Sequence, residues 1–328
     1  MKNNYELEIL NNSNIILWND FFDQYNGLVT IAHNPTLSKI LKKSFGFDSK
    51  NIMIKQSDKI IGVFPISIIN GKLVSIPHFS YGDILLNGSE TEKKKIRDKI
   101  LNKQYEIRSF EAFSAYYNDL KIMSYLELKD SVEDQWNYWK SKLRSQIRKG
   151  IKNGVQVKKG RKEYLTEFYR VYSKNMRDIG SPVLSYKFFK NILEFYQHGE
   201  AKVFLAEYQN KTIASSIVLT YKDFAEVCWA SSLKEFNNTQ ANMVIYWEMI
   251  KHAVNQNYDI FSFGRSSKDS NTYRFKKQWN PKEKQLYFNY SHPQKISIKK
   301  MTFLSKLWSK LPLFIANLIG PYISKRIY

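Results

Sequence analysis

Residues 201–231, AKVFLAEYQNKTIASSIVLTYKDFAEVCWAS, predict three strands joined by two short polar turns, and this stretch decides the fold. Branched and aromatic residues dominate each run, as in strands with a buried face. The strands are expected over residues 201–208, 212–221 and 224–231. A three-stranded meander therefore forms the centre of the second half of the chain.

The elements around this meander repeat in the first half, where a second meander is expected over residues 51–77. Each half reads β-α-α-β-β-β-α-β, which predicts an α/β chain of two tandem lobes, each with a central mixed sheet flanked by helices. The expected elements of the first half are strands at 7–10, 51–56, 60–69, 72–77 and 105–110, and helices at 14–22, 34–46 and 89–103. Those of the second half are strands at 155–159 and 259–263 and helices at 162–178, 185–196 and 239–256, besides the meander.

Capping residues support several of these helix starts. Ser89 and Glu92 form a capping box, and Ser185 caps a later helix. A second box, Ser131 with Asp134, predicts a helix over residues 131–149 that links the lobes. We therefore expect a first lobe over 1–128, a second lobe over 129–290 and a tail over 291–328.

The composition indicates a globular protein of a reducing compartment with anionic partners. The chain has 328 residues, 43% of them hydrophobic, and a formal net charge of +21. This field favours phosphorylated carriers, nucleic acid or anionic lipids without choosing among them. The single cysteine, Cys228, excludes an internal disulfide framework. The segment Met1–Leu10 lacks the apolar core of a signal peptide, so we expect a cytoplasmic protein.

Several motifs make a family resemblance specific. The element order is that of the GNAT acyltransferase fold, and the motifs resemble those of the FemAB family over about residues 15–290. The most similar branch is the one associated with exopolysaccharide and exosortase clusters, which has a BioF2-like acetyltransferase domain. The motifs are KLRSQIRK at 142–149, NMRDIGSP at 175–182, FGRS at 263–266, YRFK at 273–276, and GVFP, SIP and YGD in the first lobe.

This resemblance implies a transferase. It implies transfer of an activated acyl or aminoacyl group to an amine, or a hydroxyl, of a cell-envelope glycan or peptidoglycan-type precursor. The implied donor is aminoacyl-tRNA, an acyl-CoA or an acyl carrier, with no bound cofactor. The implied partner is a phosphorylated or lipid-linked envelope precursor. Two features depart from the bridge-forming members: no helical hairpin arm fits within the second lobe, and FKKQW at 275–279 replaces the usual Phe-Lys-x-Gly-Phe.

The candidate catalytic residues come from the closing motifs. Lys276 stands among aromatic residues, where burial lowers a lysine pKa and a nearby anion restores the charge. Acyl transfer to an amine passes through an oxyanion, which Lys276 is suited to stabilise. The alternative is a surface lysine beside an aromatic turn. Arg265 follows a strand at the end where ligand sites commonly form, with a structural ion pair as its alternative. The expected catalytic residues are Lys276, Arg265 and Tyr273.

Substrate binding is expected from a basic segment and from the loops. Ten lysines and arginines and no acidic residue lie between Lys140 and Lys162. Arg144 and Arg148 are four residues apart, so they share a helix face and could grip a diphosphate, although a solvated charged face is the alternative. The expected substrate-binding residues are Lys142, Arg144, Arg148, Arg177, Ser181, Tyr81, Trp229 and Ser266, in a cleft between the lobes. Trp229 also fits a core position.

Other chemistries find less support. Asp83, Glu226, Asp178 and Tyr246 are conceivable general bases, but none stands at a telling spacing. The five histidines are scattered, so no metal site is expected. The segment FNNTQANM at 236–243 lacks the glycines of a phosphate-cradling loop, which weakens coenzyme A as donor. A non-catalytic module that binds an anionic lipid-linked glycan or RNA remains the alternative function.

The last part of the chain is basic and amphipathic. Residues 294–328 contain seven lysines or arginines and no acidic residue, interleaved with apolar ones. Pro312 and Gly320-Pro321 are expected to divide it into short helices that cannot span a bilayer. This pattern favours contact of residues 295–328 with the inner leaflet of the cytoplasmic membrane. The alternative is that the tail packs on a lobe or on a second subunit.

Overall fold

Both predicted meanders are present, and they belong to one continuous sheet. A computed structural model describes residues 5–11, 13–294 and 298–327. The first half contains β1 (Tyr5–Ile9), α1 (Ile15–Asp23), η1 (Ile31–His33), α2 (Thr36–Phe45), β2 (Asp48–Gln56), β3 (Lys59–Ile69), β4 (Lys72–Ser75), β5 (Leu85–Leu86), α3 (Glu90–Ile100), β6 (Tyr105–Ser109) and β7 (Tyr116–Glu127).

The second half repeats this arrangement. It contains α4 (Val132–Tyr138), α5 (Ser141–Lys152), β8 (Gln156–Gly160), η2 (Lys162–Tyr164), α6 (Leu165–Asp178), α7 (Tyr186–Phe195), β9 (Ala201–Tyr208), β10 (Lys211–Tyr221), β11 (Phe224–Ser232), η3 (Lys234–Thr239), α8 (Ala241–Asn255), β12 (Ile260–Ser267), α9 (Asn271–Lys277), β13 (Lys282–Tyr290), α10 (Ile298–Trp308) and α11 (Leu313–Ser324). The predicted α/β fold class is confirmed.

Two strands that the sequence did not predict join the lobes. The sheet order is β1-β2-β3-β4-β6-β13-β7-β12-β11-β10-β9-β8, and β5 pairs with β3. Strand β13 comes last in the chain, yet it pairs with β6 of the first lobe. Strand β7 comes before the second lobe, yet it pairs with β12 inside that lobe. The chain therefore crosses between lobes twice, and a boundary at residue 128 separates β7 from the strand that it pairs with.

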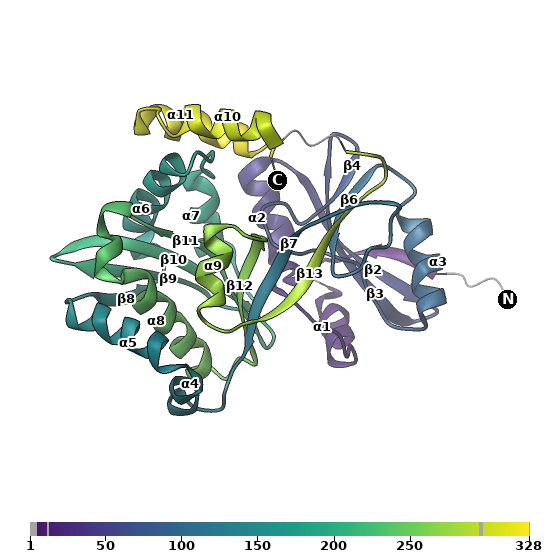
Figure 1. The fold of residues 1–328 in the computed structure, drawn as a ribbon. Coiled ribbons are helices and arrows are strands. Elements are labelled where there is room, and N and C mark those ends of the chain that lie inside the picture. The colour runs from purple at the N-terminus through teal and green to yellow at the C-terminus, as the bar shows by residue number, and fades with distance from the viewer. Residues whose placement is uncertain (1–4, 12, 295–297, 328) are drawn as a thin grey trace.

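Helices cover both faces of the sheet (Figure 1). Helices α1, α2, α6 and α7 pack into a core that runs through both lobes, with Phe45 of α2 against Phe188 of α7. Helices α5 and α8 cover the opposite face of the second lobe, and α3 covers that of the first lobe. Each lobe contains one parallel strand pair, β4 with β6 and β11 with β12.

The predicted caps at Ser89, Ser131 and Ser185 are present, but two predictions of where helices end are wrong. Ser89 and Glu92 form the expected box, and Ser185 accepts the amide hydrogen of Phe188. The predicted linking helix is instead two helices, because the chain turns to an extended conformation at Trp139. Pro312 separates α10 from α11 as expected, but Pro321 lies inside α11 rather than ending it. Among the described residues, no helix is long and apolar enough to cross a membrane.

Candidate active site

The candidate site begins where β11 and β12 diverge. The two strands pair in parallel from Phe224 and Ile260 to Glu226 and Ser262. Beyond this point both strands are irregular, and the pairing of β12 with β7 shifts register between Ser262 and Arg265. Gly264 stands in this bulge with φ of 68°, a conformation in which a Cβ is unfavourable. The divergence leaves main-chain groups free to bind side chains.

Lys276 fills the point of divergence. It lies on α9, which begins after Ser270, whose hydroxyl accepts the amide hydrogen of Tyr273 at 3.1 Å. The Lys276 Nζ donates to the carbonyl oxygens of Gly264 at 2.8 Å and Arg265 at 3.0 Å. The side chain is 2% exposed. An ammonium has three N–H donors, and the backbone takes two of them.

The charges around Lys276 are strongly perturbed. Burial lowers the pKa of Lys276 to about 7, and the nearby Glu226 carboxylate partly opposes this. Burial also raises the pKa of Glu226, against a hydrogen bond from the Ser262 hydroxyl at 2.9 Å. Ser80 of the first lobe hydrogen-bonds Glu226 and accepts the amide hydrogen of Arg265 at 3.2 Å. A buried amine and carboxyl that titrate nearer neutrality than usual are typical of a functional site.

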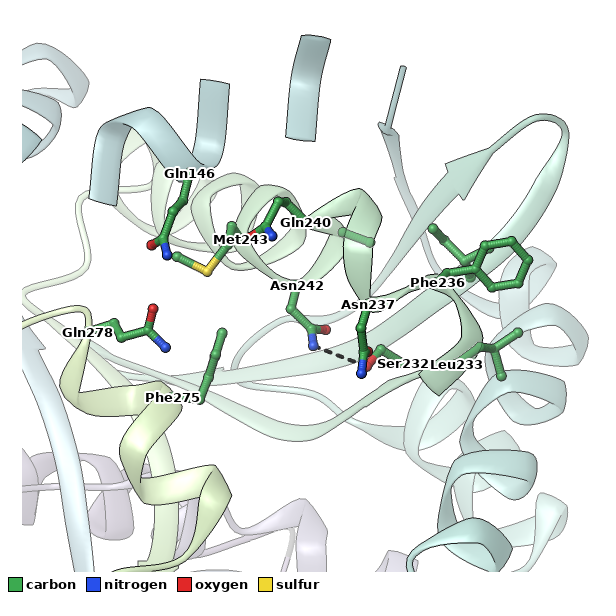
Figure 2. A pocket seen from close by; sticks show the side chains of 12 residues that line it. Gln146, Ser232, Leu233, Phe236, Asn237, Gln240, Asn242, Met243, Phe275 and Gln278 are labelled. Atoms are coloured by element: carbon green, nitrogen blue, oxygen red, sulfur yellow. Dashed lines mark hydrogen bonds between the residues drawn. The ribbon is translucent and has the colours of Figure 1, made fainter. Parts of the chain in front are cut away.

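A groove runs beside this cluster at the start of α8 (Figure 2). Two adjoining hollows of about 300 and about 440 Å³ share Ser232, Asn237, Asn242 and Phe275. Asn242 donates to the Ser232 hydroxyl at 3.0 Å. We call these two hollows the α8 groove. Its further polar lining is Gln146, Asn175, Asp178, Ser231, Lys234, Gln240, Tyr246, Asn271, Thr272 and Gln278.

The wall of the α8 groove touches the Lys276 cluster through Tyr246. Its ring stacks on Phe263 at 5.8 Å and meets Phe275 edge-on at 4.9 Å between centroids. Phe263 directly precedes Gly264, and Phe275 directly precedes Lys276. The ammonium therefore lies behind a groove wall made of aromatic rings, and it is absent from the groove surface itself.

The helix start at the α8 groove is already occupied by protein groups. Gln240 takes a left-handed conformation that would suit glycine, and the Ala241 amide donates to the Thr239 hydroxyl at 3.3 Å. Helix α5 packs against this turn, since a Cβ on Gly150 would lie 2.5 Å from Val244 and 3.1 Å from the Gln240 carbonyl oxygen. The Ala241 amide is therefore engaged by a protein group, although the α8 groove opens beside the same turn.

The basic helix α5 presents two different faces. Lys142 lines a third hollow together with Lys277, and this hollow adjoins the α8 groove through Gln146 and Gln278. Arg144 and Arg148 share a face, as expected, but successive residues turn by about 100°, so this face lies opposite Lys142. Arg144 contacts Asn137, and Arg148 lies over the Trp136 ring at 5.3 Å, both on α4. In the structure, Lys142 lies at the hollow that adjoins the α8 groove, whereas Arg144 and Arg148 point toward α4.

The remaining predicted residues are dispersed. Arg177 donates to the Leu311 carbonyl at 3.0 Å, a contact that joins it to the tail, and it also pairs with Asp178.

Tyr81 is buried in the first lobe and stacks on Phe110 at 4.2 Å, and Trp229 packs against Phe188 and Phe189. Tyr273 contacts Lys277 and Glu283 on the outer side of α9. Ser181 follows α6 near the tail, and Ser266 is buried beside Arg265. They do not form one interlobe cleft.

Arg265 and the possible bases have distinct surroundings. Burial and the nearby Arg108 lower the pKa of Arg265 to about 9, and its guanidinium lies over the Phe288 ring at 5.5 Å. Asp83 lies apart, in a first-lobe hollow, where burial raises its pKa to about 6. Of the four acids and phenols considered, Glu226 is the one beside Lys276. Among the described residues, no group of His, Cys, Asp and Glu could hold a metal ion.

Sequence reasoning missed most residues of the α8 groove. Asn175 lies in the motif NMRDIGSP and Gln240 in the segment FNNTQANM, and both line the groove. Nothing in the spacing of these two amide side chains distinguishes them from amides on the protein surface. Asn242 and Phe275 were likewise not assigned, although both line the two hollows. The only signal was indirect, because these residues cluster at the ends of predicted strands and helices.

Comparisons with known proteins agree with this geometry. Residues 140–277 match the family model described as an acetyltransferase (GNAT) domain. The UDP-N-acetylmuramoylpentapeptide-lysine N(6)-alanyltransferase of Weissella viridescens is 26% identical over 140 residues, or 42% of this chain and 41% of that protein. The match therefore spans less than half of the curated relative's length.

Solved structures show the same fold. FemX superposes with a TM-score of 0.63 at 14% identity, over 93% of this chain and 100% of that one. The C-terminal domain of a putative lysylphosphatidylglycerol synthetase from Agrobacterium fabrum gives 0.56 at 8% identity, over 94% and 96%. The divergent parallel strands beside a long helix place the chain in the class of GNAT-fold proteins. Its fold is similar to that of FemX, and part of its sequence is similar to the Weissella viridescens alanyltransferase.

Proposed function

We propose that the chain transfers an activated aminoacyl or acyl group to an amine of a cell-envelope precursor of the peptidoglycan type. The observation that carries this proposal is the perturbed ammonium of Lys276 at the divergence of β11 and β12, behind the α8 groove. The similarity to a lysine N(6)-alanyltransferase supports an amine acceptor and an aminoacyl donor. A hydroxyl acceptor is the less supported variant.

In the proposed reaction, the acceptor amine attacks the carbonyl carbon of an ester donor. The new N–C bond forms, the ester C–O bond breaks, and the amine proton goes to the leaving oxygen. Lys276 would stabilise the oxyanion of the tetrahedral intermediate by its positive charge, across the aromatic wall that separates it from the α8 groove. Glu226 is the carboxylate placed to hold that ammonium charged. Arg265 adds a second positive charge at the same place, and Tyr273 stays a prediction without a partner in this step.

The donor is proposed to be aminoacyl-tRNA rather than coenzyme A. The Thr239 hydroxyl accepts from the Ala241 amide, which a coenzyme A diphosphate would need, and the turn before α8 lacks the glycines that let a diphosphate approach closely. Basic residues of α5, including Lys142, lie at the adjoining hollow and suit a polyanionic donor. We therefore expect product from charged tRNA and none from acetyl-CoA or longer acyl-CoAs.

A mass-spectrometric assay tests donor and acceptor together. Purified protein receives UDP-linked muramoyl pentapeptide or a lipid extract, with charged tRNA or an acyl-CoA supplied separately. One added aminoacyl mass with tRNA alone is the expected result. Product with acyl-CoA alone would overturn the donor assignment. Retention of the precursor without product from any donor would favour the binding module and overturn the transferase proposal.

The pH dependence tests the state of Lys276. Its ammonium form stabilises the oxyanion, and its pKa is about 7. The charged fraction is therefore nearly complete below about pH 6, about half at pH 7, and falls about tenfold per unit above about pH 8. We expect turnover by the wild type, divided by the residual turnover of Lys276→Met at each pH, to decline above about pH 7. A ratio that is flat to pH 9 would contradict this role.

The place of action follows from the substrates. We infer that the protein works in the cytoplasm, at the inner leaflet of the cytoplasmic membrane, because charged tRNA is made in the cytoplasm and a lipid-linked acceptor would lie at that surface. Fractionation of cells tests this inference. Protein that remains with the membranes at low salt supports it, and full recovery in the soluble fraction contradicts it.

A further inference from the structure

The C-terminal helices attach to the second lobe by their smallest residues. Helices α10 and α11 lie together on the outside of the molecule, and α11 packs beside α6 (Figure 1). The buried residues of α11 are Ala316, Gly320 and Ser324, which are four apart and form one stripe. A Cβ on Gly320 would lie 2.8 Å from the Val183 side chain. The contact with the lobe is therefore close and nearly without large side chains.

The large apolar residues of α11 face the other way. Phe314, Leu318 and Tyr322 are 73%, 67% and 74% exposed and also stand four apart. This second stripe is offset by two residues from the buried one, which places it on the opposite side of the helix. In an amphipathic helix packed on its own protein, the large apolar residues normally face inward. Here that pattern is reversed.

Helix α10 shows the same reversal. The backbone of Ser305 contacts Gly180, where an added Cβ would lie 2.3 Å from its carbonyl oxygen. Phe303 and Leu307, each two residues from Ser305, are 63% and 51% exposed. Leu304 is 53% exposed. The two helices together present an apolar ledge on the outer side of the molecule, made of Phe303, Leu304, Leu307, Phe314, Leu318 and Tyr322.

The charged residues of α10 and α11 themselves are all positive. Lys306, Lys310, Lys325 and Arg326 are exposed, and no acidic residue follows Glu283 in the sequence. Large apolar residues with lysines at their margin match an anionic lipid surface, where rings enter the acyl boundary and ammonium groups meet lipid phosphates. A protein partner of ordinary composition would require some acidic complement at the rim.

The ledge also adjoins the α8 groove. The Leu311 carbonyl, between α10 and α11, accepts from Arg177, and Arg177 pairs with Asp178. Asp178 and Ile179 line the groove, and Ile179 is 59% exposed. A surface bound to the ledge would therefore lie one helix diameter, roughly 10 Å, from this side of the groove.

We propose that α10 and α11 form a membrane-docking surface for the anionic inner leaflet, and that it sets the α8 groove beside lipid-linked acceptors. The sequence predicts membrane contact for residues 295–328. The structure describes 298–327 of this segment, and residues 295–297 and 328 lie outside the described residues. The proposal rests on the inferred place of action. Vesicle binding needs no donor and no transfer, so failure of docking and failure of the transferase proposal are distinguished.

Co-sedimentation of the full chain with vesicles tests the docking surface. Vesicles of phosphatidylglycerol mixed with phosphatidylcholine are compared with vesicles of phosphatidylcholine alone. The wild type is expected to bind the anionic vesicles, and high salt should weaken this binding. The double variant Phe314→Ser with Leu318→Ser should bind at least about tenfold more weakly. One aromatic ring and one aliphatic side chain no longer enter the lipid in this variant.

A matched control separates docking from general stickiness. Tyr117→Ser with Leu120→Ser removes two side chains that are each 51% exposed on β7, outside α10 and α11, and should bind within about twofold of the wild type. Equal loss in both double variants, or no binding of the wild type to anionic vesicles, would overturn the proposal. A wild-type dimer that Phe314→Ser with Leu318→Ser converts to monomer, without vesicle binding, would also overturn it, because a second copy would then cover the ledge.

Discussion

Replacement of Lys276 by methionine should lower turnover by about 100- to 1,000-fold, because it removes a positive charge that stabilises the oxyanion. Methionine keeps the length of the side chain but cannot donate to the Gly264 and Arg265 carbonyls. Two unpaired carbonyls cost about 1–3 kcal/mol each, while the penalty for burying an ammonium disappears. The variant should therefore fold, and circular dichroism and steady-state kinetics measure the two effects separately.

Lys282→Met is the control for this substitution. Lys282 lies on β13, is more than half exposed, and pairs only with Glu127 at the surface. Such a pair contributes little to stability, so turnover should stay within about twofold. Wild-type turnover by Lys276→Met would remove Lys276 from the mechanism, whereas loss of folding would assign it a structural role instead.

Local sequence signals predicted most of the fold because they depend on neighbouring residues. Both meanders, and the capped starts at Ser89 and Ser185, follow from hydrophobic pattern and side-chain caps within a few positions. Strands β7 and β13 escaped prediction for the opposite reason. The outer half of β7 is exposed, and its pairing with β12 joins residues more than 130 positions apart. No local pattern specifies an exchange of strands between lobes.

The candidate site was predictable only in part. Lys276 and Arg265 came from motifs that resemble a family, and they do lie together at the divergence of β11 and β12. The spacing of Arg144 and Arg148 correctly predicted a shared face. It could not predict that α4 lies against that face, since the break at Trp139 that folds α4 back has no clear signal. Groove residues such as Asn242 converge only through tertiary packing.

Replacement of Trp279 by alanine should lower the free energy of unfolding by about 3–5 kcal/mol. Trp279 lies two residues after the end of α9 and is fully buried. It packs edge-on against Trp139 at 5.6 Å and lies beside Phe263 and Tyr246. These contacts fix the end of α9 on the sheet, so their loss should also move Lys276 from the Gly264 and Arg265 carbonyls. Turnover should consequently fall even at temperatures where the variant remains folded.

Trp136→Ala provides the comparison for this last substitution. Trp136 is only partly buried, on α4, and contacts Trp247 at 5.0 Å between ring centroids. Its truncation opens a smaller cavity, so denaturant unfolding should show a loss of about 1–2 kcal/mol, with turnover nearly unchanged. Equal losses of stability at both positions would mean that the full burial of Trp279 contributes no more to the free energy of unfolding than the partial burial of Trp136. Full turnover by a destabilised Trp279→Ala would show that the position of the Lys276 ammonium does not depend on the packing of Trp279. The aromatic wall of the α8 groove would then not be what holds the ammonium in place.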